Sequence, residues 1–252
     1  MDYIPGQIGI AGSLQTAESP QLFAKKPWHL DISLLVETAG VMFAVILEVK
    51  ILATSSVSAF GWFITPGILV AASLIPTAFR GSRLPDIGFG NGQIKFALGV
   101  FGRVCLVILP SVFVGLWLLR ICSFELPLRP VLPQNHKWAC WVFYQFMYVA
   151  VAEEVFFRGY VQNNILKLAG GVGRGRCPPK TSWRMGWMSI VLSAACFAIA
   201  HIIVQGRITS ALTFLPGLVL GWLFVRTRSL LAPILFHGLA NTCYCIMAVG
   251  LA

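Results

Sequence analysis

Charged residues are scarce in this 252-residue chain, where Asp, Glu, Lys and Arg together occupy only 11% of the positions. Hydrophobic residues occupy 57%. Water-soluble domains contain roughly 25% charged and 45–50% apolar residues, so this composition excludes an ordinary soluble domain. The few charges also cluster between long apolar runs. The sequence therefore predicts an integral membrane protein.

Three further absences narrow the functional class. The chain has no CxxC pair and no HExxH motif, so the common sequence signatures of a zinc site are missing. No internal repeat is visible, which argues against a repeat-built transporter. No basic stretch is interleaved with stacking aromatic residues, so we expect no nucleic-acid partner despite the net charge of +10. The bilayer is the expected partner of these positive charges, through its anionic headgroups.

Long apolar windows define the expected fold, because a spanning helix needs about 20 mainly apolar residues. Seven windows qualify, at 32–48, 57–79, 96–119, 138–165, 186–204, 208–225 and 229–251. Glu37 and Glu48 interrupt the first, which makes it the weakest. We predict an all-α polytopic membrane protein, a bundle of about seven transmembrane helices with a range of six to eight. Residues 1–28 are expected to form a polar tail and residues 29–252 a single transmembrane domain.

Positive residues predict the orientation of the chain, because short loops rich in Lys and Arg stay in the cytoplasm. The side of the N-terminus carries Lys25, Lys26, Arg80, Arg83, Lys95, Lys167, Arg174, Arg176, Lys180, Arg184, Arg226 and Arg228. The opposite side carries Lys50, Arg120, Arg129, Lys137 and Arg207. We therefore expect a multi-pass protein with a cytoplasmic N-terminus.

The first polar cluster lies inside the fourth window, in the stretch FMYVAVAEEVFFRGY. Ionisable groups inside a spanning helix cost several kcal/mol, so they are rare and usually functional. Glu154 and Arg158 are four residues apart, so they lie on one helix face and can neutralise each other. Glu153 points about 100° away and has no local partner. Such a carboxylate is suited to act as a general base on water.

Two more polar clusters lie on separate, later windows. His201 ends the stretch SIVLSAACFAIAH, where a lone histidine is more often a partnered residue of the bundle than a catalytic one. His237 and Asn241 are four residues apart, which places an imidazole and a carboxamide on one helix face. Both can donate hydrogen bonds to one point, as an oxyanion site requires, or can bond to neighbouring helices instead.

The three motifs EExxxR, FxxxH and HxxxN, in this order on separate windows, resemble those of the CPBP family of intramembrane proteases. Its eukaryotic members are the type II CAAX prenyl endopeptidases. The stretch FLPGLVLGWLFVRTRSLLAPILFHGLAN is also similar, and the resemblance runs from Val142 to Asn241. It implies an endopeptidase whose catalytic helices lie within 138–251. Such an enzyme cuts near the C-terminal end of a membrane-embedded or lipidated protein or peptide.

The resemblance also implies a role for each motif residue. Glu153 and His201 would hold and deprotonate the attacking water, while His237 and Asn241 would stabilise the oxyanion. Glu154 and Arg158 would brace the site and bind the C-terminal carboxylate of the substrate. One tension concerns depth, because His201 lies near the far end of its window and Glu153 near the middle of its own. The sequence implies either a tilted or kinked helix or a misplaced window boundary.

No cofactor is expected, and the alternative is Zn²⁺. His201, His237 and a glutamate are ligand types that zinc accepts. Asparagine is an uncommon zinc ligand, however, and the two histidines lie on different helices. Two alternative functions also stay open. One is a non-catalytic membrane immunity or binding protein of the same family, and the other is a proton or ion transporter that uses the buried carboxylates as relays.

Overall fold

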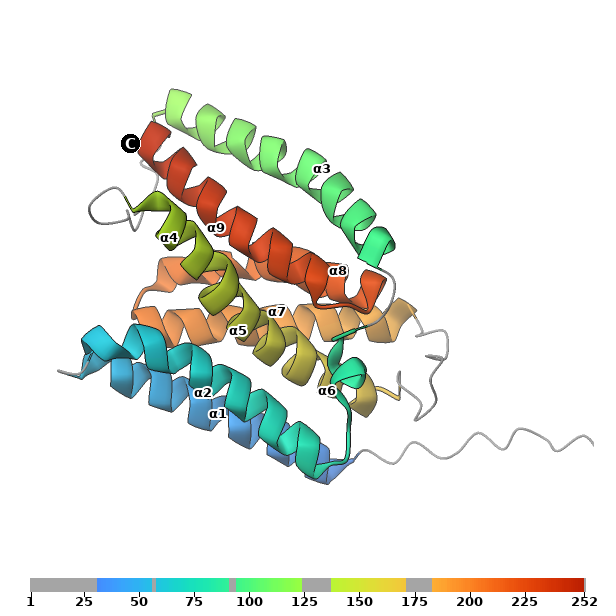
Figure 1. Cartoon of the computed structure of the whole chain (residues 1–252). Coiled ribbons are helices and arrows are strands. Elements are labelled where there is room, and N and C mark those ends of the chain that lie inside the picture. Colours follow the sequence, from blue (N-terminus) through green and yellow to red (C-terminus); the bar gives the residue numbers. More distant parts are fainter. Residues whose placement is uncertain (1–30, 56–57, 91–93, 124–136, 171–182, 252) are drawn as a thin grey trace, which may run out of the picture.

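The structure, a computed structural model, describes residues 31–55, 58–90, 94–123, 137–170 and 183–251 (Figure 1). Every regular element in these ranges is a helix, so the predicted all-α class is confirmed. Six helices there are long and apolar enough to cross a membrane, namely Ile32–Thr54, Ile94–Ile121, Trp138–Leu168, Trp183–Gln205, Ile208–Thr227 and Leu231–Gly250. The second predicted window corresponds to α2 (Ser58–Phe79). The predicted tail 1–28 lies outside the described residues.

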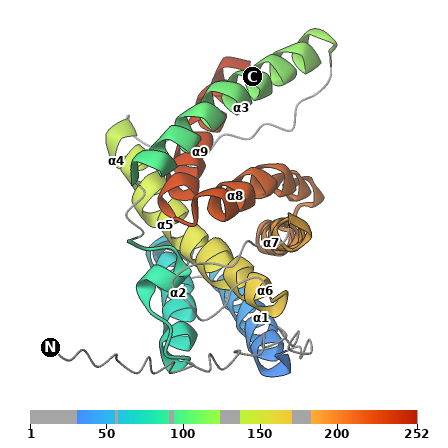
Figure 2. The ribbon, with the colours of Figure 1, turned by 90° about the vertical axis from the view of Figure 1, so that its right-hand side faces the viewer.

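The helices pack as three pairs around one long central helix (Figures 1 and 2). The pairs are α1 (Ile32–Thr54) with α2 (Ser58–Phe79), α7 (Trp183–Gln205) with α8 (Phe214–Thr227), and α3 (Ile94–Ile121) with α9 (Leu231–Leu251). The central helix runs from Trp138 to Leu168 and contacts all three pairs. Short 3₁₀ turns lie at Leu84–Ile87 (η1) and Ile208–Thr213 (η5). Side chains of the central helix are therefore the ones that can meet residues of every pair.

The central helix is not a regular α-helix along its whole length. Its α-helical parts are α4 (Trp138–Tyr144), α5 (Val151–Glu154) and α6 (Asn163–Leu168), and its π-helical parts are η3 (Gln145–Ala150) and η4 (Val155–Gln162). π-Helical turns are rare and often occur at functional sites. Here they flank the single α-helical turn that carries Glu153 and Glu154.

A polar clamp fixes the central helix against the first helix pair. The Tyr160 hydroxyl donates to Glu37 Oε1 at 3.1 Å, and Arg80 Nε donates to Glu37 Oε2 at 2.7 Å. One helical turn further along the central helix, Asn164 Nδ2 donates to Thr38 Oγ1 at 3.1 Å. Glu37, which weakens the first apolar window, thus has two partners on other helices. The clamp sets the depth at which the carboxylate turn sits in the bundle.

The crossing of two helices resolves the depth tension between Glu153 and His201. Glu153 lies near the middle of the central helix, whereas His201 lies only four residues before the end of α7. Figure 2 shows α7 end-on, with the central helix crossing it obliquely. Because of this crossing, His201 Nε2 comes within 3.9 Å of Glu153 Oε2. The explanation is therefore helix tilt, and neither boundary is misplaced by more than a few residues.

Candidate active site

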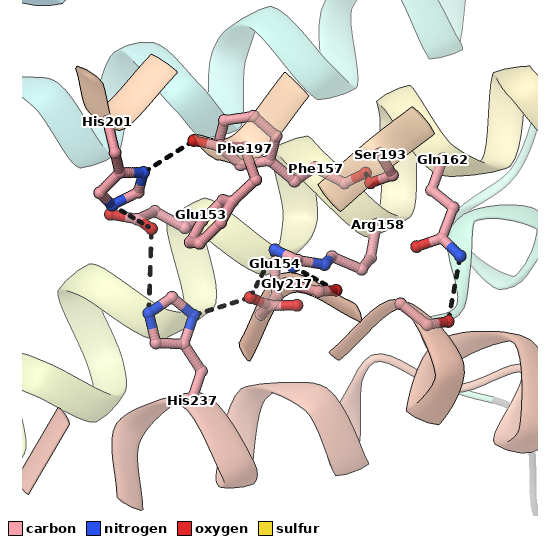
Figure 3. A network of polar contacts seen from close by, with 11 residues as sticks. Glu153, Glu154, Phe157, Arg158, Gln162, Ser193, Phe197, His201, Gly217 and His237 are labelled. Atoms are coloured by element: carbon pink, nitrogen blue, oxygen red, sulfur yellow. Dashed lines mark hydrogen bonds and ion pairs between the residues drawn. The ribbon is translucent and has the colours of Figure 1, made fainter. Parts of the chain in front are cut away.

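Three helices bring two imidazoles to one carboxylate (Figure 3). Glu153 comes from the central helix, His201 from α7 and His237 from α9. The Nε2 atoms of His201 and His237 lie 3.9 and 3.8 Å from Glu153 Oε2. Both separations exceed a direct hydrogen bond. Glu153 Oε2 is buried, and no hydrogen-bond partner for it lies in the described part of the chain.

The predicted pair of Glu154 and Arg158 is present at the centre of the bundle. Arg158 Nη1 donates to Glu154 Oε1 at 2.9 Å, and both side chains have 0% exposed surface. His237 Nδ1 lies 2.7 Å from the same oxygen. The carboxylate accepts this hydrogen bond, so Nδ1 carries a proton and Nε2 is the nitrogen that faces Glu153. Glu154 thus both neutralises Arg158 and orients His237.

Arg158 has two further contacts that hold its guanidinium in place. Its Nη2 donates to the carbonyl of Gly217 at 3.3 Å, and its guanidinium lies 4.6 Å from the centre of the Phe197 ring. A cation over an aromatic face is attracted by the ring quadrupole. Arg158 is fully buried and contacts Glu154, the Gly217 carbonyl and the Phe197 ring, so its guanidinium is not accessible to a substrate carboxylate. Its position fits the bracing role, and the carboxylate-binding role has no support here.

Two glycines allow close approach of α8 to its neighbours, Gly217 to α7 and Gly221 to the central helix. Gln162 Nε2 donates to the Gly221 carbonyl at 3.0 Å, one turn after the contact between Arg158 and Gly217. A Cβ at Gly217 would lie 3.2 Å from Ala194 Cβ, and one at Gly221 would lie 3.3 Å from Gln162 Oε1. Both distances are tight. The Gly-x-x-x-Gly spacing on α8 therefore matches the four-residue spacing of the two donors on the central helix.

Phe197 organises the site from α7. Its carbonyl accepts a hydrogen bond from His201 Nδ1 at 2.9 Å, which fixes the ring so that Nε2 points to Glu153. Its own ring lies 4.3 Å from the His201 ring and 6.0 Å from the His237 ring, measured between centroids. The FxxxH motif includes this residue, yet the spacing alone assigns it no role. The structure shows that it contacts His201, His237 and Arg158 together.

Asn241 has a partner that sequence reasoning missed. Its Nδ2 donates to Gln145 Oε1 at 3.0 Å, across from α9 to η3. Close helix approach permits this bond, since a Cβ at Gly238 would lie only 2.6 Å from the Phe146 ring. Asn241 and His237 thus share a helix as predicted, but each has a separate side-chain partner. Gln145 lies eight residues before Glu153, and no motif or spacing signals it.

An apolar cavity of about 390 Å³ leads to the site. Glu153 and His201 line it, and each has 20% of its side chain exposed. Its other walls are mostly apolar and come from α1, α2, α7 and the central helix, including Val45, Ile46, Leu69, Tyr148 and Phe156. His237 and Glu154 lie behind this wall, with 7% and 0% of their side chains exposed. An apolar chain in the cavity would therefore lie against the carboxylate and one imidazole.

The side chains at this centre bear on the zinc alternative. Across the described ranges, no group of three or more His, Cys, Asp and Glu residues is placed to hold a metal ion. The Nδ1 atoms of His201 and His237 are bound to Phe197 and Glu154, so only Nε2 of each ring faces Glu153. The described residues thus give the zinc alternative no support.

Buried carboxylates and imidazoles that meet inside an apolar helical bundle define a class, that of polytopic membrane proteins with an intramembrane polar centre. Residues 135–243 match the family model described as Type II CAAX prenyl endopeptidase Rce1-like. The resemblance drawn from the three motifs is confirmed over this segment. The family supports protease activity for this integral membrane protein. Searches of curated proteins and of solved structures gave no match.

Proposed function

We propose that the chain is an intramembrane endopeptidase in which Glu153 and His201 activate a water molecule. The observation that carries this proposal is the buried, unpartnered Glu153 Oε2 that faces both imidazoles at 3.9 and 3.8 Å. Buried polar atoms without partners are few in folded proteins, and catalysis is one accepted reason for them. A water oxygen about 2.8 Å from both Glu153 Oε2 and His201 Nε2 is compatible with their separation.

The reaction is a water addition followed by loss of the amine. Glu153 takes a proton from the water, whose oxygen forms a bond to the scissile carbonyl carbon while an electron pair moves to the carbonyl oxygen. His201, with its Nδ1 hydrogen bound to the Phe197 carbonyl, accepts the second water hydrogen bond at Nε2. Collapse of the tetrahedral intermediate breaks the C–N bond. The proton held by Glu153 passes to the departing amine nitrogen.

His237 is the first proposed oxyanion donor. Its Nδ1 proton is held by Glu154, so an Nε2 proton makes the ring an imidazolium. A carboxylate bound to Nδ1 stabilises that cation, as in serine hydrolase triads. With His237 charged, the positive charges of His237 and Arg158 balance the negative charges of Glu153 and Glu154. Such balance matters because an uncompensated charge in a buried site is costly.

Asn241 is the second proposed donor, and Gln145 is its positioning residue. A carboxamide nitrogen carries two hydrogens, and one of those on Asn241 is bound to Gln145 Oε1. This bond fixes which end of the carboxamide is the donor. The second hydrogen remains for the oxyanion, which the Asn241 amide and the His237 ring would bind together.

The proposed substrate is a membrane-embedded or lipidated protein or peptide that is cut near its C-terminal end. The apolar walls of the cavity support this assignment, because they favour an apolar segment beside the reacting bond. The lipid bilayer is the second proposed partner, through the exposed apolar faces of the helices. Neither a cofactor nor nucleic acid has a role in the proposed reaction.

The change Glu153→Gln tests the proposal. It preserves side-chain size and removes the base, so turnover of membrane-segment peptides in detergent should fall to background with an unchanged melting temperature. Glu48→Gln is a matched control, because Glu48 is an exposed carboxylate on α1. The control should keep full turnover. Near-normal turnover by Glu153→Gln would remove this residue from the role of base. A wild-type chain without peptidase activity would favour a non-catalytic member of the family.

A further inference from the structure

Arg103 is a charged residue on the most exposed of the spanning helices. It lies on α3, which is the least buried of the six candidate spans in the described part of the chain. Charged groups inside a spanning segment normally face the bundle interior or a partner. Arg103 is exposed instead, and within the described ranges its one hydrogen bond runs from Nε to the Gly99 carbonyl at 3.1 Å. Its charge therefore calls for a partner outside the bundle.

The guanidinium of Arg103 lies close to one boundary of the hydrocarbon core. Arg103 is nine residues after Ile94, the first residue of α3, or about 14 Å along the axis. Its side chain runs back by one turn, about 5 Å, towards Gly99, where a Cβ would lie 4.0 Å from Nη2. The 28 residues of α3 span about 42 Å, so a centred α3 extends about 6 Å beyond a core of about 30 Å at each end. The guanidinium thus reaches the depth where lipid headgroups begin.

Two further exposed cations lie beside this position. Lys95 is on the same face of α3 as Gly99 and Arg103, because the three are spaced by four residues. Arg226, in the last turn of α8, places its guanidinium 5.0 Å from the centre of the Phe96 ring. The start of α3 accordingly lies beside the junction of α8 and α9 (Figures 1 and 2). Among the described residues, no carboxylate forms an ion pair with any of the three cations. We call Lys95, Arg103 and Arg226 the basic corner.

The surface of α3 becomes apolar directly beyond the basic corner, towards the middle of the membrane. One turn after Arg103, the side chains of Leu106 and Val107 are 77% and 63% exposed. An anion at the corner would therefore have apolar surface next to it, which suits a ligand with one anionic group and an apolar chain. Inorganic phosphate lacks the apolar part. A single carboxylate on a partner helix would compensate one of the three positive charges and leave two.

We propose that the basic corner binds the phosphate group of an anionic glycerophospholipid, whose acyl chains lie along α3 over Leu106 and Val107. The guanidinium of Arg103 can donate two parallel hydrogen bonds to phosphate oxygens, and Lys95 and Arg226 add positive charge beside it. A lipid held in this way contacts both α3 and α8, so it should also stabilise the folded chain. The proposal goes beyond the peptidase function and does not depend on it.

Lipid retention by the full-length protein tests the site. The protein is equilibrated in mixed micelles with equal amounts of phosphatidylglycerol and phosphatidylcholine, and native mass spectrometry counts the lipids that stay bound. We expect the wild type to retain phosphatidylglycerol preferentially. Arg103→Gln should lower the ratio of the two retained lipids about fivefold, the effect of one basic residue at a membrane surface. Arg120→Gln is the matched control, because Arg120 is an exposed arginine in the last turn of the same helix. It should keep the wild-type ratio.

A second variant and a second ligand complete the test. Lys95→Gln/Arg226→Gln leaves Arg103 in place and should also lower the retained ratio. Phosphatidylglycerol should raise the melting temperature of the wild type more than that of Arg103→Gln, and inorganic phosphate should raise neither. A wild-type ratio in Arg103→Gln would overturn the site and favour a carboxylate of a partner helix. An equal loss in Arg120→Gln would overturn it too, because retention would then follow net charge. Stabilisation by inorganic phosphate alone would overturn the lipid as the ligand.

Discussion

Removal of Glu154 should unfold the site through the charge it leaves behind. In Glu154→Ala, Arg158 keeps its positive charge at a position with 0% exposed surface and loses its carboxylate partner at 2.9 Å. Breaking a buried ion pair in this way costs about 3–5 kcal/mol. His237 also loses its bond at 2.7 Å, and hydrogen bonds to charged groups contribute about 1.5–3 kcal/mol.

The double variant separates this charge effect from simple loss of packing. Glu154→Ala/Arg158→Ala removes both charges, so the cost of the unpaired guanidinium disappears although the Gly217 bond is lost as well. We expect a melting temperature about 6–20 °C below wild type for the single variant, from about 2–4 °C per kcal/mol in a chain of this size. The double variant should recover part of that loss.

Thermal unfolding in one detergent, at one protein concentration, measures both variants side by side. Arg80→Ala is the control, because Arg80 also pairs with a glutamate but both side chains are partly exposed, at 29% and 27%. Its loss should cost at most about 1 kcal/mol. A double variant no more stable than Glu154→Ala would show that the two residues do not act as a pair.

Three further predictions concern the chemistry. Asn241→Ala should lower turnover about 10²–10³-fold, which is the usual effect of losing one oxyanion donor. Unchanged turnover in steady-state kinetics would refute the role of Asn241 as an oxyanion donor. Gln145→Ala should lower kcat with little change in KM. Because Gln145 acts through Asn241, the double variant should be hardly less active than Asn241→Ala alone. Full additivity of the two effects in this double-mutant cycle would contradict the positioning role. Activity should survive exhaustive chelation, with no stoichiometric zinc by elemental analysis. Loss on chelation with recovery only in added zinc would make Glu153 a base on metal-bound water or a ligand.

Local spacing predicted the parts of the structure that depend on neighbouring residues of one helix. Apolar windows gave the helices to within several residues, apart from α1, which runs six residues beyond its predicted end at 48. The four-residue spacing of Glu154 and Arg158 gave their contact, because i and i+4 side chains meet on a helix. The assignment of catalytic roles stays a prediction.

Residue spacing along one helix does not predict contacts between different helices. Tyr160 and Glu37 lie 123 positions apart, and Asn241 and Gln145 lie 96 apart, so no periodicity links them. The sequence pairs Glu154 with Arg158, whereas its bond to His237 depends on how α9 packs on the central helix. The π-helical turns also change which faces the central residues occupy, and an α-helical wheel drawn from sequence cannot reveal that change.

The polar central helix has a consequence for how the chain enters the membrane. Trp138–Leu168 is the least apolar of the six spanning helices in the described part of the chain. An Arg, Lys or Asp at the centre of a lone helix opposes insertion by about 2.5–3.5 kcal/mol. The groups that satisfy Arg158 and Glu154 from outside, Gly217 and His237, are synthesised at least 59 residues later than Arg158. Stable insertion of the carboxylate-bearing helix should therefore await the synthesis of α8 and α9, and a nascent chain that stops before them should be a substrate for membrane quality control.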